Sequence, residues 1–525
     1  MSEDKTFSKH KAGSNNNYSG FKKDGGFPKR GSGFKRDGGF TRGGGHSKDG
    51  GSGSGFKREG GFKRDGGFKR DSGFKRYAQD QERSYSSKPN ISGHKFFREV
   101  AISLIEQIYT KVDFIDNLIT SDRGFRLLEG SNRAMARNII SNSLRHKSLL
   151  DFIIRKYVTV DDLDEKLRFI LYAALTEELI LNTPAYAVLH SYVDITKKLY
   201  PAGSGLVNAV LRRVEENMDE INAIDFVQLK QPWFYYRWQK EYSEAQAKIF
   251  IQALASQPTM DLTFRSPEKL QIAQTEIEGA VVNNEYSLRV PTNINLSNVT
   301  GYAQGDFWVQ SLSSFLSVYS FKDKLKGKYV LDVCAAPGGK TLTMNALGAK
   351  KICAFDKADH RISVIKKNLE RMKISSKEVY TKSINVFDIE DFETFDVILL
   401  DAPCISTGTL RKNPEIVVTK KPVMLKATTD IQLKMLRYIF SRMKAGTTLI
   451  YATCSLQKEE NEHLINNFMI EKKPSGARIV PIEANENITS DMITKEGYMR
   501  ITPDMYSEHG GLEGFFAAHI TKVEK

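Results

Sequence analysis

The sequence predicts a doubly wound α/β domain in the C-terminal part of the chain, preceded by an all-α domain and a small α+β domain. The stretch from Tyr329 to Thr341 predicts a short, mostly apolar strand, a glycine turn and the start of a helix. Further short apolar runs each end in distinctive residues, as at the ligand-binding edge of an open parallel sheet. These runs are 352–355, 397–400 and 448–452.

The glycine turn after the first of these strands suits a nucleotide-like ligand. Gly338 and Gly339 have no Cβ, so a ligand can lie against the backbone beside the helix expected over 341–347. Asp356 follows at the tip of the second strand, where an acid hydrogen-bonds ribose hydroxyls. The turn is neither G-x-G-x-x-G nor a phosphate loop, and a purely structural βα turn is the alternative interpretation.

Residues 1–90 form a low-complexity segment that we predict to be disordered. Phe56, Phe62, Phe68 and Phe74 recur six residues apart among glycines and charges, and such isolated rings cannot offset the entropy of ordering. The segment holds 21 Lys or Arg and 10 Asp or Glu, and thus 11 of the chain's 14 net positive charges. Aromatic residues among Lys and Arg suit loose RNA binding. A passive, solubilising tail is the alternative.

The remaining elements follow in the order helical, mixed and α/β. From about Phe96, apolar residues at helical spacing predict helices over 133–144, 149–156, 163–178, 185–199 and 207–215. The mixed segment is expected to hold a helix over 243–255 and strands over 261–264 and 286–290, and a last strand is expected near 514–520. The predicted segments are therefore 1–90, 91–225, 226–320 and 321–525.

Composition and motif content exclude several classes of protein. No apolar run reaches roughly 18 residues, so no membrane span is expected, and the polar N-terminus lacks the apolar core of a secretory signal. The four cysteines form no C-x-x-C pair and no zinc pattern. We therefore expect free thiols, no metal and a cytoplasmic setting. The net charge of +14 favours a polyanionic partner.

Two cysteines follow the exits of expected strands and are candidates for chemistry. Cys404 stands three residues after Asp401, and Cys454 stands between a threonine and a serine. Free thiols are often inert small hydrophobes in a core, which is our interpretation of Cys353 in mid-strand. Cys334 lies in the glycine turn, where we expect it to pack or to line the ligand.

Three motifs carry a resemblance to a known family. Cys334-Ala-Ala-Pro-Gly-Gly-Lys340, Asp401-Ala-Pro-Cys404 and Tyr451-Ala-Thr-Cys454-Ser resemble the Sun/Fmu family of S-adenosylmethionine-dependent RNA cytosine-C5 methyltransferases. The resemblance implies a Rossmann-like class I methyltransferase domain. Upstream, residues 182–188 and 206–212 look like the NusB-like RNA-binding domain of the bacterial ribosomal member, so the resemblance covers roughly residues 95–525.

This subtype implies a substrate as well as a reaction. It implies methylation at C5 of one cytosine in 16S, small-subunit ribosomal RNA, and we expect a monomer that binds neither a membrane nor a metal. A related enzyme acting on transfer RNA or large-subunit ribosomal RNA is the main alternative. A catalytically silent, RNA-binding ribosome assembly factor is a second alternative, which the intact motifs disfavour. A nicotinamide-dependent dehydrogenase is remote, because the dinucleotide-binding glycine pattern is absent.

The shared motifs allow the residues of the family's S-adenosylmethionine site to be matched to positions in this sequence. The resemblance implies that Asp356 binds the ribose and that Asp401 lies at the boundary between cofactor and base. Asn385 occupies the position of the family's acid near the adenine, with Asp388 as a later candidate, and Gln310-Ser311 stands where the family has Gln-Asp. The residues implied to hold the methionine and adenosine parts are Cys334, Ala335, Ala336, Pro337, Gly338, Gly339 and Lys340.

The resemblance also implies three catalytic roles. Cys454 is the implied nucleophile, Cys404 helps to release the methylated product, and Asp401 donates to or holds cytosine N3. These roles fit the chemistry of the base, because C5 of cytosine takes a methyl group only after a thiolate has added to C6. Cysteine suits the first role since a small fraction is thiolate at neutral pH. The target base must be unpaired or flipped to reach such a site.

Overall fold

The computed structural model describes residues 96–159 and 163–524, all of which belong to one compact unit. The tail expected over residues 1–90 lies outside the described residues. None of the described helices combines the length and the apolar character that crossing a lipid bilayer requires.

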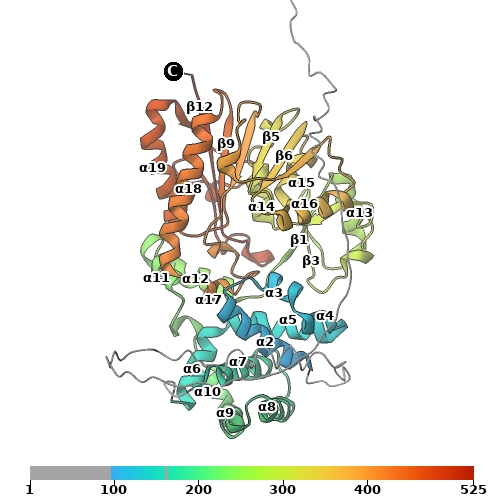
Figure 1. Cartoon of the computed structure of the whole chain (residues 1–525), viewed down its shortest axis with the longest axis vertical. Coiled ribbons are helices and arrows are strands. Elements are labelled where there is room, and N and C mark those ends of the chain that lie inside the picture. Colours follow the sequence, from blue (N-terminus) through green and yellow to red (C-terminus); the bar gives the residue numbers. More distant parts are fainter. Residues whose placement is uncertain (1–95, 160–162, 525) are drawn as a thin grey trace, which may run out of the picture. The chain divides into compact units, whose positions relative to one another are not determined.

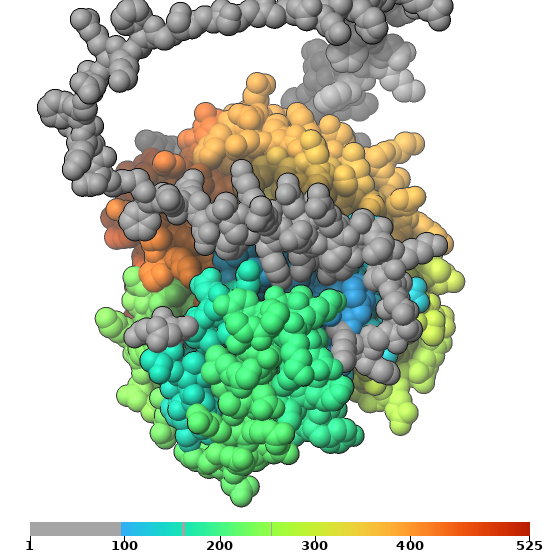
Figure 2. Space-filling model, turned by 60° about the horizontal axis from the view of Figure 1, so that its bottom comes forward, coloured from blue at the N-terminus to red at the C-terminus, as the bar shows by residue number. Residues whose placement is uncertain are grey.

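The first described segment is a bundle of helices around its own apolar core. The helices are α2 (Phe96–Lys111), α3 (Ile115–Ser121), α4 (Arg123–Leu127), α5 (Gly130–Arg145), α6 (Lys147–Tyr157), α7 (Glu165–Leu179), α8 (Ala185–Leu199), α9 (Ser204–Glu216) and α10 (Met218–Asn222). Apolar side chains one helical turn apart, such as Val100, Leu104 and Ile108, place one face of α2 in this core. In Figure 2 the green residues of α8 and α9 lie on the surface of the bundle.

A small antiparallel sheet follows, in the strand order β2-β3-β1-β4. Its strands are β1 (Met260–Phe264), β2 (Val281–Asn284), β3 (Ser287–Val290) and β4 (Phe307–Val309), and α13 (Pro267–Glu276) packs on it. Phe264, Leu288 and Phe307 are fully buried between the sheet and α13. The preceding helices α11 (Trp233–Glu241) and α12 (Glu244–Ala255) pack instead against Leu410 and Leu456 of the later chain.

A larger mixed sheet forms the C-terminal part, in the order β10-β12-β9-β8-β5-β6-β7, with β11 paired to β12. Its strands are β5 (Tyr329–Val333), β6 (Lys351–Asp356), β7 (Val379–Ser383), β8 (Val397–Asp401), β9 (Thr448–Thr453), β10 (Ala477–Ile479), β11 (Met499–Ile501) and β12 (Phe515–Lys522). The strands from β5 to β9 are parallel, whereas β12 runs antiparallel to β9. The Rossmann-like class predicted from the sequence is confirmed, with antiparallel strands added at one edge.

Helices cover both faces of the larger sheet, as Figure 1 shows. They are α14 (Leu312–Tyr319), α15 (Gly339–Ala346), α16 (Asp359–Arg371), α18 (Pro422–Arg442) and α19 (Glu462–Lys472), whereas the short α17 (Ile416–Thr419) packs against the helical bundle. Successive side chains of a strand point to opposite faces. Val330 accordingly packs with Leu342 and Ile365 on one face, while Leu331 packs with Leu436 on the other.

The parallel strands bring their carboxyl ends to one edge of the sheet. Val333 pairs with Phe355 on one side and with Leu400 on the other, and Asp401 pairs with Ala452. The segments that follow β5, β6, β8 and β9 therefore leave the sheet at the same edge. These segments carry the residues singled out in the sequence.

Candidate functional site

Two cysteines meet at this edge. Cys404 follows β8 and Cys454 follows β9, and their sulfur atoms lie 3.6 Å apart. Both thiols are free and half-buried, and the sulfur of Cys404 also lies 3.5 Å from the hydroxyl oxygen of Ser406. The sequence predicted that both thiols stand at strand exits, and the fold brings them into direct contact.

The contact between the thiols makes them chemically unequal. A hydrogen bond from the Cys404 thiol lowers the pKa of Cys454 and outweighs the effect of burial, which acts in the opposite direction. Lys340 also helps to lower the pKa of Cys454. The same hydrogen bond, together with burial, raises the pKa of Cys404 well above its usual value. These directions favour Cys454 as the thiol of the pair that ionises.

A partly buried ion pair lies beside the thiols. The ammonium of Lys340 donates a hydrogen bond of 2.7 Å to Oδ2 of Asp401 and lies 5.0 Å from the ring centre of Phe515. Burial acts to lower the pKa of Lys340, but the charge of Asp401 prevails and raises it. Lys340 is thus a stable cation that fixes the orientation of the Asp401 carboxylate.

The glycine turn is tied to α16 through its backbone carbonyls. Gly338, at a φ of 103°, adopts the left-handed conformation that favours glycine and is the N-cap residue just before α15. Arg361 donates to the carbonyl of Ala336 at 3.0 Å, and Asn368 donates to that of Pro337 at 2.9 Å. These two side chains hold the outer half of the turn in place.

The carboxylate of Asp356 hydrogen-bonds to the turn through one oxygen, and its other oxygen has no partner among the residues that the structure describes. Its Oδ2 accepts a hydrogen bond of 3.2 Å from the backbone N–H of Ala336 and lies 3.3 Å from a guanidinium nitrogen of Arg361. Its Oδ1 is buried and has no hydrogen-bond partner. A buried oxygen without a partner costs free energy unless a ligand satisfies it. A ribose hydroxyl, as in S-adenosylmethionine, fits this acceptor.

The surroundings of the other residues singled out in the sequence point to no particular ligand. The side-chain oxygen of Asn385 accepts a hydrogen bond of 3.2 Å from the backbone N–H of Phe387, and Asp388 is exposed. Cys334 and Cys353 are half-buried against the apolar core of the sheet. Within residues 96–159 and 163–524, no group of three or more His, Cys, Asp or Glu side chains is arranged to hold a metal ion.

Several residues at the site carry no signal in the sequence. Arg361 and Asn368 project from α16 and reach the glycine turn only in the folded chain. Glu460 lies close to Cys454 in the sequence but 55 residues after Ile405, and Gln432 lies 29 residues after Pro403. Only the folded chain shows that both side chains reach the loop that carries Cys404.

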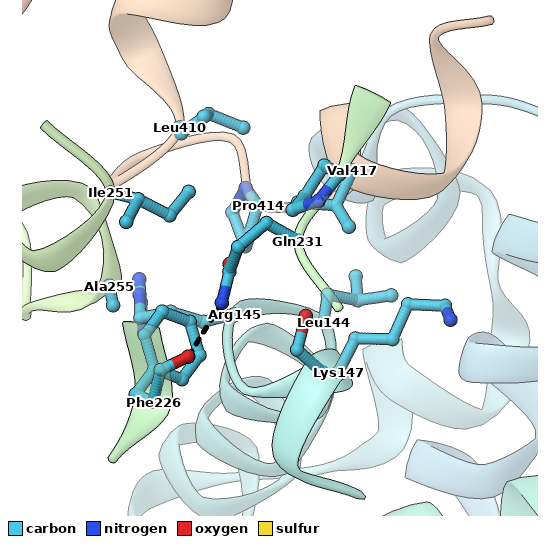
Figure 3. Close-up of a pocket in the computed structure, with 12 residues that line it drawn as sticks. Leu144, Arg145, Lys147, Phe226, Gln231, Ile251, Ala255, Leu410, Pro414 and Val417 are labelled. Atoms are coloured by element: carbon cyan, nitrogen blue, oxygen red, sulfur yellow. Dashed lines mark hydrogen bonds between the residues drawn. The ribbon is translucent and has the colours of Figure 1, made fainter. Parts of the chain in front are cut away.

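The segment after Cys404 also contacts the helical bundle. The guanidinium of Arg145 donates to the carbonyl of Arg411 at 2.6 Å. Beside this contact lies a small, largely apolar pocket, where Figure 3 shows Arg145, Gln231, Leu410 and Val417, with Gln231 donating to the carbonyl of Phe226. The pocket contains none of the site residues above, and we assign it no ligand.

Glu415 lies in the same contact and yields a test of stability. Its Oε1 accepts a hydrogen bond of 3.3 Å from the backbone N–H of Ile115, while its Oε2 is buried without a partner. Burial raises the pKa of Glu415 to about 7. A carboxyl group whose pKa is raised on folding keeps its proton in the folded state, so its contribution to stability falls as the pH rises from 4.5 to about 7.

We expect Glu415→Gln to stabilise the protein at pH 8 and to have a smaller effect at pH 4.5. A shift of this size corresponds to at most about 3 kcal/mol in the free energy of unfolding. Thermal melting of the wild type and the variant at both pH values measures the difference, and Glu393→Gln is the exposed control. Equal dependence on pH in wild type and variant would show that Glu415 is not a destabilising charge.

Comparisons with known proteins agree with this geometry. Residues 322–521 match the family model described as 16S rRNA methyltransferase RsmB/F, and residues 97–216 match the NusB family. Ribosomal RNA small subunit methyltransferase F of Shewanella piezotolerans is 31% identical over 245 residues, which cover 46% of this chain and 51% of that protein. Ribosomal RNA small subunit methyltransferase B of Escherichia coli is 28% identical over 389 residues, which cover 71% of this chain and 89% of that protein.

The fold is shared with a solved structure. The crystal structure of PH0851 has a TM-score of 0.63 and 22% identity, and the match covers 82% of this chain and 99% of that one. This likeness concerns the fold, whereas the family models identify the two segments of the chain. Residues 322–521 therefore match the RsmB/F family of methyltransferases, and the preceding residues 97–216 match the NusB family.

Proposed function

We propose that the protein methylates C5 of a cytosine in small-subunit ribosomal RNA, with S-adenosylmethionine as the methyl donor. The observation that carries this proposal is the pair of thiols 3.6 Å apart at the sheet edge. One of them is favoured as a thiolate, and a fixed carboxylate lies nearby. The relatives named small-subunit ribosomal RNA methyltransferases support the choice of RNA.

The glycine turn and Asp356 are suited to hold the methyl donor. Bound S-adenosylmethionine supplies the electrophilic methyl group that C5 takes up. The free Oδ1 of Asp356 would accept hydrogen bonds from its ribose hydroxyls. Gly338 and Gly339 let its methionine part lie against the backbone at the start of α15. For the adenine we keep Asn385 and Asp388 as candidates.

The two thiols and Asp401 have different roles in the reaction of the base. The thiolate of Cys454 adds to C6, which places negative charge on the ring and makes C5 nucleophilic. Protonated Asp401 would donate its proton to N3, where part of that charge develops, and would take it back when the Cys454 thiolate leaves; Lys340 beside it offsets the charge left on the carboxylate. After C5 has been methylated, a base removes the C5 proton, and the electron pair of that bond reforms the double bond as the Cys454 thiolate leaves. We assign Cys404 to this release step.

The helical segment is suited to bind the RNA substrate. We infer that residues 91–225 form an RNA-binding domain, that residues 226–320 form a connecting α+β domain, and that residues 321–525 form the catalytic domain. The NusB-family match of residues 97–216 supports the first assignment. We infer a cytoplasmic, monomeric enzyme that requires no metal.

Methylation of purified RNA tests the proposed function. The full-length protein is incubated with labelled S-adenosylmethionine and with small-subunit ribosomal RNA, large-subunit ribosomal RNA or transfer RNA from cells that lack it. We expect the label in the small-subunit RNA, as 5-methylcytosine at one position in bisulfite sequencing. Label confined to transfer RNA or large-subunit RNA would contradict the substrate, and absence of label from all three would contradict the activity.

Replacing Asp356 tests the methyl-donor site separately. We expect Asp356→Asn to weaken S-adenosylmethionine binding by about tenfold or more, because a hydrogen bond to a charged acceptor is lost. The amide oxygen can still accept from the backbone N–H of Ala336, so the turn is retained. Isothermal titration calorimetry measures the dissociation constant, with the exposed Asp388→Asn as control. Unchanged affinity in Asp356→Asn would remove Asp356 from the site.

A further inference from the structure

A buried carboxyl group joins the two loops that carry the thiols. Glu460 is fully buried just ahead of α19. Its Oε1 accepts a hydrogen bond of 2.9 Å from the backbone N–H of Ile405, and its Oε2 accepts one from the hydroxyl of Ser455. Ile405 directly follows Cys404, and Ser455 directly follows Cys454. One side chain therefore contacts the residue after each thiol.

Gln432 of α18 adds a second tie to the Cys404 loop. Its amide nitrogen donates to the carbonyl of Pro403 at 2.8 Å and to Oε1 of Glu460 at 3.1 Å. Pro403 and Ile405 flank Cys404, so the backbone is held on both sides of the thiol. Gln432 is fully buried, which keeps water from competing for these bonds.

The neighbouring residues hold the Cys454 loop in the same way. The hydroxyl of Tyr451 donates to the backbone carbonyl of Glu460 at 2.6 Å. The side chain of Asn461 accepts from the hydroxyl of Thr453 at 2.6 Å and donates to the carbonyl of Ser455 at 2.8 Å. Glu460 and Asn461 thus hydrogen-bond to the chain both before and after Cys454.

We propose that Glu460 is a positioning residue that sets the separation of the Cys404 and Cys454 sulfur atoms. This inference rests on the proposed function for its kinetic consequence, but not for its structural one. The thiol–thiol hydrogen bond requires a short distance between the two sulfur atoms, and the ties from Glu460 to Ile405 and Ser455 keep their loops together. Loosening these ties weakens that hydrogen bond and thus lowers the thiolate fraction of Cys454.

In this proposal Glu460 acts through the positions of its two hydrogen-bonding atoms rather than through its charge. Burial raises the pKa of Glu460 to about 7, so near neutral pH the group is partly protonated. A glutamine places an oxygen and an amide nitrogen in the same two positions: the oxygen can accept from Ile405 and Gln432, and the amide can donate to the Ser455 hydroxyl. We therefore expect Glu460→Gln to preserve the arrangement and Glu460→Ala to lose it.

The first test separates kcat from KM in RNA methylation. We expect Glu460→Ala to lower kcat by about 100-fold, the order of loss produced by a misplacement of about 1 Å. The KM values for RNA and S-adenosylmethionine should stay within about twofold, because Glu460 contacts neither. We expect Glu460→Gln to stay within about threefold of the wild type. Glu459→Gln is the matched control, since the neighbouring Glu459 pairs with Arg237 and not with the thiol loops.

The second test needs no methylation activity. Iodoacetamide modification at pH 7, followed by peptide mapping, measures the alkylation rate of Cys454 in each variant. We expect Glu460→Ala to slow alkylation of Cys454 several-fold relative to alkylation of Cys353, while Glu460→Gln resembles the wild type. Circular dichroism melting checks the fold. Ser455→Ala, which removes the tie between Glu460 and the Cys454 loop together with the hydrogen bond from the backbone N–H of Gln457, replaces Glu460→Ala should the latter not fold.

The outcomes distinguish the two proposals. Unchanged kcat and unchanged Cys454 alkylation in Glu460→Ala would overturn the positioning role. A Glu460→Gln variant as impaired as Glu460→Ala would also overturn it, because charge rather than shape would then be required. A wild-type protein that methylates no RNA would refute the proposed function alone, and the alkylation rates would still decide the role of Glu460.

Discussion

We expect Cys454→Ala to abolish methyl transfer and to leave the fold and RNA binding intact. Its thiol is the only one of the Cys404–Cys454 pair whose pKa is lowered, so its removal takes away the thiolate that activates the base. Without covalent addition at C6, C5 of cytosine stays too poor a nucleophile to accept a methyl group. We expect activity to fall to background in a labelled-methyl assay with small-subunit ribosomal RNA.

A matched cysteine variant controls for the loss of a thiol as such. Cys353 is also free and half-buried, but it lies within β6 and packs against the sheet core. We expect Cys353→Ala to retain full activity, and both variants to bind RNA as the wild type does in a filter-binding assay. Residual methylation by Cys454→Ala above background would refute the nucleophile assignment.

Cys404→Ala is expected to stop after the first methyl transfer with RNA attached to the protein. Cys454 can still add to the base in this variant, though more slowly because its hydrogen bond with Cys404 is lost, but the release step loses the thiol that we assign to it. Cys404 lies 3.6 Å from the nucleophile sulfur, which is close enough to act at the same ring. A covalent protein–RNA species that resists denaturing electrophoresis is the predicted product.

The double variant shows which thiol forms this species. Cys404→Ala combined with Cys454→Ala should give no adduct, since the nucleophile is then missing. Persistence of the adduct in the double variant would place the covalent bond elsewhere. A Cys404→Ala enzyme that turns over at the wild-type rate would exclude a role for Cys404 in release.

Much of the larger sheet could be predicted because its inner strands are buried on both faces. Such strands are continuous apolar runs, and the expected run 329–333 coincides with β5. β7 has no such signature, because it lies at the sheet edge and its residues alternate between partly buried and exposed. The short strands β2 and β4 were missed for a related reason, since four and three residues carry too little periodicity.

The candidate site was predictable only where it follows strand ends. Asp401, Cys404 and Cys454 lie within three residues of such ends, and parallel strands bring these ends together. The contacts that tune the site come from α16, α18 and the turn before α19, at sequence distances that no local pattern encodes. The ion pair of Lys340 with Asp401 joins two motifs whose direct contact the spacing alone does not specify.

Trapping the intermediate on a fluorinated substrate tests the central claim most directly. In RNA that carries 5-fluorocytosine, C5 can be methylated, but its fluorine cannot leave as a proton does, so the bond to C6 persists. Wild-type protein is incubated with this RNA and S-adenosylmethionine, digested, and mapped by mass spectrometry. We predict one methylated nucleotide bound to the sulfur of Cys454. Attachment to Cys404 instead, or methylation of the RNA without any covalent attachment, would contradict the mechanism.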